Sequence, residues 1–298
     1  MVTEPIRPLS RRSLLAGMAA LTAGGCAITR SGTAPRRPLG LADLTVIKPL
    51  AGDYAGTLKR VAHMGYSHFG FRLAGYSAAD KSELPPAEKA RLVRDAGLQV
   101  GVVRYGMGDN FAKQAEDAAA IGASVIALSA APVFFRGRKL GETTRAAFDA
   151  WLPELGRMAE TARALGLRLA YHNHWWDHVP LDGTTPLDLI ARNFSPRDVA
   201  FEIDLAWAFL GGVDPLSLVR SLGPRVLAMH FKDVNPALGT DRMKQLVVPG
   251  TGVLDYPTLI PQLDEVTKAI GYVEVDMPKD GLAEAASAAE LIQSARRV

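Results

Sequence analysis

Short apolar runs alternate with longer amphipathic segments along the chain from about Leu41 onward. The runs have the length of buried strands and the segments between them have the spacing of helices, which predicts a parallel sheet flanked by helices. The predicted strands are residues 44–47, 68–73, 99–105, 124–129, 167–173, 200–204, 226–231 and 271–276. The predicted helices are residues 54–64, 86–96, 110–121, 143–165, 185–193, 215–222, 256–269 and 282–297.

Eight strand–helix pairs in a chain of 298 residues, 48% of them hydrophobic, match one (β/α)8 barrel, the TIM-barrel architecture. Helix boundaries support the pattern, since Asp53 precedes the first helix, Gly166 closes the fourth and Pro215 opens the sixth. A doubly wound sheet is the alternative. The turn after the first predicted strand, residues 48–52, lacks the glycine-rich fingerprint of that class. We therefore expect a single TIM-barrel domain over residues 41–298.

Ionisable residues at the ends of the last four predicted strands share one parity. Residues of a barrel strand alternate between the interior and the helix layer. The residues on the polar parity are His172 with His174, Glu202 with Asp204, His230 with Lys232, and Glu274 with Asp276. Strands covered by helices have no structural need for polar residues on one side, and barrel enzymes build their active sites at the carboxyl ends of the strands. The pattern predicts a functional site there.

Asp204, His230 and Glu274 are the firmest candidates for metal ligands, because three successive strands deliver them to the same end of the barrel. Imidazole and carboxylate ligands without a thiolate suit Mn²⁺, Mg²⁺, Co²⁺ or Zn²⁺. The one cysteine of the chain, Cys26, lies near the N-terminus, which excludes an intrachain disulfide and a thiolate cluster. The sequence therefore predicts a divalent metal ion as cofactor.

Residues 1–26 have the features of a twin-arginine signal peptide, with Arg11 and Arg12 followed by a short, weakly apolar stretch. Cys26 follows Ala-Gly-Gly and resembles the lipidated cysteine of a lipoprotein, which would attach the protein to a membrane; cleavage by an ordinary signal peptidase is the alternative. Residues 27–40 are rich in small and polar side chains and are predicted to form a tether. These features predict a periplasmic protein.

Charge gives no support for a nucleic-acid partner. The formal net charge is +3, but residues 1–37 contain six arginines and one glutamate. The remaining chain holds 28 of the 34 basic and 30 of the 31 acidic residues, a net charge of −2. We also expect no cluster of Lys and Arg near the strand ends, which a nuclease would need to bind the phosphate backbone.

Six motifs follow one another at characteristic spacings in the second half of the chain: Tyr171-His172-Asn173-His174, Phe201-Glu202-Ile203-Asp204, Gly211-Gly212-Val213-Asp214-Pro215, His230-Phe231-Lys232-Asp233, Gly250-Thr251-Gly252-Val253-Leu254-Asp255-Tyr256 and Val273-Glu274-Val275-Asp276. Together they resemble the sugar phosphate isomerase/epimerase family of xylose-isomerase-like TIM barrels. The resemblance extends from about residue 41 to the C-terminus. With the leader, it indicates an exported, twin-arginine-signal subgroup.

The resemblance implies a metal site with four ligands. Asp204, His230 and Glu274 match three of the family's ligands directly. The glutamate that supplies the fourth is replaced in this chain, and its candidate substitutes are His172, His174 and Asp177.

The resemblance also implies proton abstraction next to a carbonyl group of a sugar or keto-sugar. Glu274 would serve as the base, and Lys232 would donate to a substrate oxygen. The second acid/base candidates are Asp177 and His174. The side chains expected to contact the sugar are Trp175, Trp176, Trp207 and Asp276.

A metal-dependent carbohydrate isomerase or epimerase is the first functional prediction, with a small carbohydrate as substrate. Epimerases of the family use two glutamates on opposite faces of the substrate, and this chain offers a histidine-rich strand in place of one. A lyase or dehydratase that eliminates a β-substituent from a 3-keto-glycoside or keto-polyol is therefore the alternative. A non-catalytic periplasmic sugar-binding module is a further alternative. The oligomeric state is left open.

Overall fold

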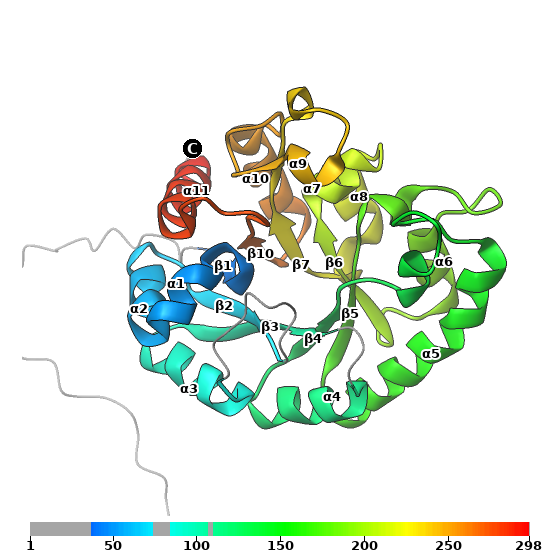
Figure 1. Ribbon diagram of the computed structural model, residues 1–298, viewed down its shortest axis with the longest axis horizontal. Helices are drawn as coiled ribbons and strands as arrows, with labels where there is room; N and C mark the ends of the chain where they lie inside the picture. Colours follow the sequence, from blue (N-terminus) through cyan, green and yellow to red (C-terminus); the bar gives the residue numbers. More distant parts are fainter. Residues whose placement is uncertain (1–36, 74–83, 107–109, 298) are drawn as a thin grey trace, which may run out of the picture. The chain divides into compact units, whose positions relative to one another are not determined.

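The computed structural model describes residues 37–73, 84–106 and 110–297. Within these residues, eight parallel strands close into a barrel in the order β1-β10-β7-β6-β5-β4-β3-β2, with helices around the outside (Figure 1). This confirms the predicted TIM-barrel class. The barrel strands are β1 Leu39–Ala42, β2 His68–Arg72, β3 Gln99–Tyr105, β4 Val125–Leu128, β5 Arg168–His172, β6 Val199–Asp204, β7 Val226–Phe231 and β10 Ile270–Val273.

The first strand lies earlier than predicted. Residues Asp43–Val46 form a 3-10 turn and α1 begins at Ile47, so the prediction of a strand over residues 44–47 is wrong. The strand that closes the barrel is β1, whose Gly40 pairs with His68 on β2 and with Tyr272 on β10. Its four residues are too few, and too rich in glycine, to stand out from the segment expected to be a tether. The predicted signal peptide, with Cys26 and the tether up to residue 36, lies outside the described residues.

The predicted helices are confirmed, with ends that shift by at most three residues. The helices are α1 Ile47–Gly52, α2 Tyr54–His63, α3 Pro86–Asp95, α4 Phe111–Ala120, α5 Arg145–Ala164, α6 Pro186–Asn193, α7 Leu205–Leu210, α8 Pro215–Leu222, α9 Arg242–Gln245, α10 Tyr256–Val266 and α11 Gly281–Ala295. The Asp53 carboxylate caps α2 by accepting from the Gly56 amide. Among the described residues, no helix is both long enough and apolar enough to span a bilayer.

Tyr272 fills the lower interior of the barrel. It packs in a small cluster with Val102, Ala127, Ala170 and Ala228, and its hydroxyl accepts a hydrogen bond from the Val102 amide at 3.2 Å. Small residues surround the ring because nothing larger fits. The apolar lower layer leaves the carboxyl ends of the strands above it for polar side chains.

The strand register brings the predicted site residues together. His172 on β5 pairs with Glu202 on β6, and Asp204 pairs with His230 on β7. Just after β10, the Glu274 amide donates to the Phe231 carbonyl at 3.2 Å, which continues the pairing with β7. The polar parity read from the sequence therefore corresponds to neighbouring side chains at one end of the barrel.

The loop after β7 is pinned by the last residue of its motif. Asp233 begins the two-stranded hairpin of β8 (Asp233–Val234) and β9 (Leu246–Val247), and one of its carboxylate oxygens accepts from the amides of Gly250 and Gly252 at 2.9 and 3.0 Å. The Tyr256 hydroxyl donates to the Lys232 carbonyl at 2.6 Å. Both contacts fix the backbone on either side of the Lys232 side chain.

Substituting Gly40 by alanine should destabilise the fold. An added Cβ would lie 2.2 Å from the Tyr272 ring, which is already confined by neighbouring strands. We expect a loss of about 1–3 kcal/mol in the free energy of unfolding, measured by urea denaturation. Gly52→Ala at the end of α1 is the matched control, because an added Cβ there meets nothing within 4 Å. Equal stability of the two variants would contradict this account of the barrel floor.

Candidate metal centre and active site

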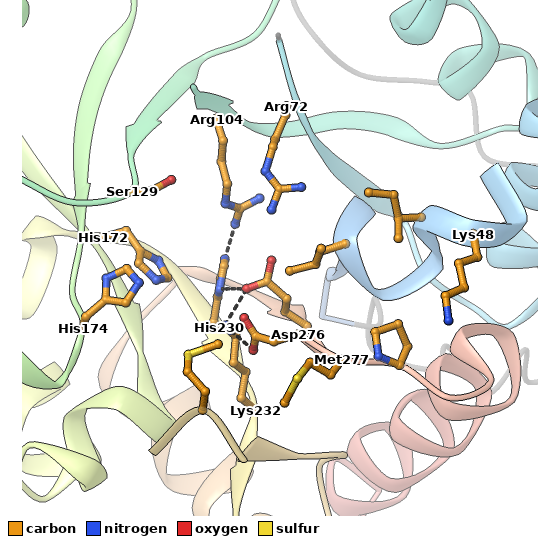
Figure 2. Close-up of a pocket in the computed structure, with 15 residues that line it drawn as sticks. Lys48, Arg72, Arg104, Ser129, His172, His174, His230, Lys232, Asp276 and Met277 are labelled. Carbon is orange, nitrogen blue, oxygen red and sulfur yellow. Dashed lines mark hydrogen bonds and ion pairs between the residues drawn. The ribbon is translucent and has the colours of Figure 1, made fainter. Parts of the chain in front are cut away.

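A cavity of about 650 Å³ opens at the carboxyl ends of the strands. Its size is within the range of roughly 300–1,000 Å³ typical of small-molecule sites. Figure 2 shows arginines from β2 and β3 and the histidines of β5 and β7 around it. The polar side chains that line it are Lys48, Arg72, Arg104, Ser129, His172, His174, His230, Lys232, Glu274 and Asp276.

Glu202 binds two histidines at once. One of its carboxylate oxygens lies 3.1 Å from His172 Nδ1, and the other lies 3.2 Å from His230 Nε2. Because a carboxylate accepts hydrogen bonds, these contacts place a proton on each of the two nitrogens and leave the other nitrogen of each ring free to bind an ion. All three side chains are buried. Glu202 therefore sets the orientation and the tautomer of both rings.

The nitrogens that face away from Glu202 converge on Asp204. Its Oδ2 lies 3.8 Å from His172 Nε2 and 3.6 Å from His230 Nδ1, and His230 Nδ1 lies 2.9 Å from Glu274 Oε2. Two ligands that each lie about 2.1 Å from a common ion are themselves about 3 to 3.5 Å apart. The donor atoms of Asp204, His230 and Glu274 are close enough to share one divalent cation, and His172 lies beside Asp204 at the edge of this group.

Two of these donors also lack directed hydrogen bonds. Asp204 Oδ2 and His230 Nδ1 are buried and have no hydrogen-bond partner in the described part of the chain. Asp204, His230 and Glu274 form one group whose ligand atoms lie within 4.8 Å of one another. Buried polar atoms are normally satisfied, so an ion at this point would complete them. The residues present fit a metal ion.

Lys232 lies among three carboxylates. Its Nζ is 2.7 Å from Glu274, 2.8 Å from Asp276 and 3.1 Å from Asp204. Burial alone would lower the pKa of Lys232, but these carboxylates outweigh it and raise the pKa well above its usual range. The side chain is therefore an ammonium ion at neutral pH, and it supplies a fixed positive charge on the wall of the cavity.

The carboxylates around Lys232 differ in acidity. Burial would raise the pKa of Glu274, but Lys232 and His230 hold it well below its usual range. Burial raises the pKa of Asp276, and the nearby Glu274 charge adds to that effect against the opposing charge of Lys232. Burial would likewise raise the pKa of Asp204, yet Lys232 and the two histidines hold it low.

The three histidines of the site also differ in pKa. Burial would lower the pKa of His230, but the charges of Glu202 and Glu274 raise it to about 10 in the absence of an ion. Burial lowers the pKa of His172 despite the hydrogen bond to Glu202. His174 has its pKa lowered well below the usual range, first by burial and then by the charges of His172 and Lys232. His172 and His174 are therefore neutral in this environment.

Asp177 does not line the cavity. The 3-10 turn Trp175–His178 buries it, and its carboxylate accepts from the Tyr171 hydroxyl at 2.6 Å and from the His174 amide at 2.8 Å. Burial raises its pKa to about 7. The turn therefore directs Asp177 into the protein, where it holds the backbone of His174. The structure brings His174 to the site and leaves Asp177 behind it.

The three tryptophans predicted to contact a sugar also lie outside the lining of the cavity. The His174 ring stacks on Trp176 with 4.5 Å between centroids and 5° between planes, and Trp207 lies 5.4 Å from the same ring. Trp175 packs against the Arg242 guanidinium at 4.2 Å, which joins the β5 loop to α9. Trp176 and Trp207 thus support His174 from below, while Asp276 does line the cavity.

Three buried residues of the site were missed at the sequence level. Glu202 fell on the polar parity without being assigned a role. Arg104 lies at the end of β3, donates to Glu202 at 2.9 Å and also contacts the His230 ring. Arg72 lies beside it at the end of β2. A charged residue at the end of an otherwise apolar strand was the available signal, and the expectation of no cluster of Lys and Arg near the strand ends is wrong.

Comparison with known proteins agrees with this arrangement. Residues 58–298 match the sequence profile described as xylose isomerase-like TIM barrel. The chain belongs to the xylose isomerase-like TIM barrel family. Of the motifs between residues 171 and 276, those of His172, Asp204, His230 and Glu274 lie at the carboxyl ends of barrel strands.

Two relatives of this family illustrate its range. An inosose dehydratase from Lacticaseibacillus casei is 25% identical over 138 residues, which cover 42% of this chain and 45% of the relative. The chain thus matches less than half the length of that protein. A sugar phosphate isomerase/epimerase from Parabacteroides distasonis superposes with a TM-score of 0.72 at 20% identity, over 89% of this chain and 96% of that one.

Another similar structure is that of the IOLI protein, which was solved with a bound zinc atom. It superposes with a TM-score of 0.62 at 14% identity, over 87% of this chain and 96% of that one. At such identities the two solved structures show that the fold is shared.

Replacing Glu202 by glutamine should weaken metal binding. Glutamine has one acceptor oxygen where the carboxylate has two, so one of the two histidines loses its orienting bond. We expect metal affinity to fall about 10- to 100-fold, measured by competition with a chromogenic chelator. Glu265→Gln, at an exposed glutamate at the end of α10, is the control. An unchanged affinity in a folded Glu202→Gln protein would show that the histidines are oriented by other contacts.

Acid lability should arise partly from His178. Burial lowers its pKa to about 4 from 6.5, and the ring lies 3.0 Å from the Asn173 amide. The unfolded chain takes up a proton below pH 6.5 while the folded chain resists until about pH 4, so stability is lost as the pH falls through this window. His178→Gln should therefore lose about 2–3 kcal/mol less than wild type between pH 7.5 and 4.5 in urea unfolding. His63→Gln, at an exposed histidine at the end of α2, is the control and should keep the stability-versus-pH curve of the wild type. Parallel curves for all three proteins would contradict a role for His178 in acid lability.

Proposed function

We propose that the protein is a metal-dependent enzyme that isomerises or epimerises a sugar or keto-sugar by removing a proton next to a carbonyl group. The observation that carries the proposal is the convergence of three ligand atoms, from Asp204, His230 and Glu274, beside the Lys232 ammonium and the Asp276 carboxylate, with His172 next to Asp204 as the candidate for a fourth. Ligands, a fixed cation and a second carboxylate on the wall of one cavity are what such a reaction requires.

A divalent ion held by these ligands would polarise the carbonyl of the substrate and stabilise the negative charge that develops on its oxygen. The donor set of two imidazoles and two carboxylates supports Zn²⁺, Mn²⁺, Co²⁺ or Mg²⁺. The zinc atom bound by the related IOLI protein adds support for a metal in this fold, with the identity of the ion left to measurement.

Two carboxylates are placed to accept the proton from carbon. Glu274 is the residue expected from the family motif, but its Oε2 already contacts His230 and Lys232. Asp276 lies outside the ligand group, and 14% of its side chain is exposed against 6% for Glu274. A general base must reach its substrate. Asp276 is therefore an additional candidate for the base, with Glu274 then serving chiefly as a ligand.

Lys232 and His174 supply the other groups. The Lys232 ammonium would donate to a substrate oxygen as negative charge develops there. His174 is neutral and stacked on Trp176, so its ring orientation is fixed on the opposite wall. As a neutral base it would take the proton of the hydroxyl next to the carbonyl and pass it to the carbonyl oxygen, while the carboxylate returns the carbon-derived proton to the neighbouring carbon, which completes an isomerisation. Asp177 contributes by holding the His174 backbone rather than by contacting substrate.

Elimination of a β-substituent is the second candidate. It shares the first proton abstraction and differs in the fate of the electron pair, which expels a hydroxyl or alkoxyl group with a proton from an acid. Support comes from the one-sided placement of the carboxylates, since Glu274 and Asp276 share one wall and histidines occupy the facing one. The inosose dehydratase relative is a further reason to test it.

We further propose that the protein is exported folded through the twin-arginine pathway and acts in the periplasm, with Cys26 as its lipidation site. Export in the folded state would let the site load its ion before other divalent metals compete for the same imidazole and carboxylate ligands. Support for this rests on residues 1–26 alone.

Proton abstraction is tested by following deuterium from D2O into a panel of ketoses and 3-keto-glycosides by NMR. The metal-loaded protein should exchange the proton next to the carbonyl, and EDTA should abolish the exchange. Asp276→Asn should retain metal and lose exchange by about 10²-fold or more, whereas Glu274→Gln should lose both.

The same spectra separate the candidates. A new ketose, aldose or epimer identifies an isomerase or epimerase, and a released alcohol or water with an unsaturated product identifies a lyase. Retained exchange in Asp276→Asn returns the base role to Glu274. Sugar binding that survives EDTA, with no exchange into any compound, would contradict the proposal and favour a binding module.

A further inference from the structure

We propose that the substrate joins its sugar or keto-sugar to an aromatic aglycone, and that apolar side chains at the mouth of the cavity bind the aglycone. The inference rests on the proposed function, because it names the class of substrate for the same cavity, but its binding test needs no turnover. We term these side chains the apolar rim. They are Leu44, Ile47, Met243, Met277 and Pro278.

The lining of the cavity changes character with depth. The candidate metal ligands at its inner end are buried, whereas Met277 and Met243 are 56% and 39% exposed and the other three rim residues are partly exposed. Lys48, exposed beside Ile47 on α1, adds one charge to this edge. Exposed apolar side chains add nothing to a core, and where they gather at a pocket they mark a surface that binds an apolar partner.

Hydrogen bonds hold the segment after β10 against the turn that precedes α1. The Val275 amide donates to the Thr45 hydroxyl at 3.0 Å, and the Lys279 amide donates to the Glu284 carboxylate at 3.2 Å. Two rim residues lie between these contacts in sequence, and two others lie within two residues of Thr45. Backbone contacts therefore fix both segments, and the rim side chains are left free to bind a ligand.

Met243 reaches the cavity from the connection between β8 and β9. Its helix, α9, begins at Asp241, whose carboxylate accepts from the Met243 amide at 3.1 Å. The neighbouring Arg242 packs on the Trp175 ring at 4.2 Å, which joins α9 to the loop after β5. These contacts position α9 through residues other than Met243, whose side chain lines the cavity.

The chemistry of the rim favours an aromatic group over a second sugar. The rim side chains are apolar, and the methionine sulfur is only a weak hydrogen-bond acceptor. Sugar hydroxyls placed there would lose water without gaining partners, which costs free energy. Methionine is flexible and its sulfur makes favourable contacts with aromatic rings, so two methionines suit aglycones of differing shape.

The position of the rim sets the direction of binding. Met277 follows the candidate base Asp276 directly in sequence, and the two lie side by side in Figure 2. A cavity of about 650 Å³ has room for a ligand larger than one sugar ring. The sugar would lie over the metal ligands, with the aglycone toward solvent. Because the rim lines the same cavity as the ligands, a substrate is favoured over a second copy of the chain as its occupant.

Matched methyl and phenyl glycosides test the inference. Both anomers of the glucosides and galactosides are titrated into metal-loaded protein carrying ¹³C-labelled methionine methyl groups, and binding is followed by NMR. We expect at least one phenyl glycoside to bind about tenfold or more tightly than its methyl partner, because more apolar surface is buried. It should shift the Met243 and Met277 resonances, assigned from Met243→Leu and Met277→Leu, and leave that of buried Met158 on α5 unchanged.

Variants locate the preference. The double substitution Met243→Gln with Met277→Gln should abolish it without unfolding the protein, because both side chains are exposed. The two leucine variants should retain it, since leucine keeps the apolar character and about the same volume. Leu238→Gln is the matched control. Leu238 is 50% exposed in the same connection as Met243 and lies outside the cavity lining, so the variant should keep the wild-type preference.

The outcomes separate this inference from the proposed function. Equal affinities within every pair, no binding of any phenyl glycoside, or a preference that survives in the folded double glutamine variant would overturn the role of the rim, even if free keto-sugars exchange deuterium. Self-association in sedimentation that the double variant loses, without a preference for phenyl glycosides, would overturn it in favour of a second copy. A preference that depends on the rim, with no exchange into any keto-sugar, would support the rim and overturn the proposed reaction.

Discussion

The pair of hydrogen bonds that Glu202 accepts from His172 and His230 is the interaction on which the rest of the site depends. A buried carboxylate is stable only if it is paired. Burial would raise its pKa, yet Arg104 and His230 hold it well below the usual range, so it stays ionised and accepts from both rings. Asn173 adds a second constraint, since its side-chain oxygen accepts from the Asp204 amide at 2.8 Å. The ligands are thus oriented before any ion arrives.

The fold accommodates these buried charges because apolar and polar side chains occupy separate layers within one barrel. Tyr272 and four small or β-branched neighbours seal the lower interior, and the charged residues lie above them. Several of the buried charges there have a partner of opposite sign on another strand of the barrel. The clearest example is Lys232, which meets three carboxylates from two other strands. The lower parts of the strands therefore contribute to the apolar core, and their carboxyl ends contribute to the candidate site.

The sequence was sufficient for the barrel class and for the ligand group, because both follow from local periodicity. Parity placed Asp204, His230 and Glu274 on one side, and closing the barrel made them neighbours. Parity within a strand does not predict which side chains from distant strands pair with each other. Arg104 and Glu202 are 98 residues apart, and only the closed sheet brings them into contact. Asp177 shows the converse, since it follows the histidines directly in sequence while a 3-10 turn directs it into the protein. Strand β1 was missed because four residues carry too little periodicity.

The position of Tyr272 bears on the depth of the cavity above it. Its ring underlies the cavity, close to Arg104, because an added Cβ at Gly70 would lie 3.5 Å from each of them. Tyr272, together with the glycines that leave room for its ring, therefore fills the barrel beneath the polar side chains. A lineage or an engineer could deepen the pocket by exchanging this tyrosine for a smaller residue, with the metal ligands and the arginines left in place. The length of the substrate that fits could then change while the side chains at the carboxyl ends of the strands stay the same.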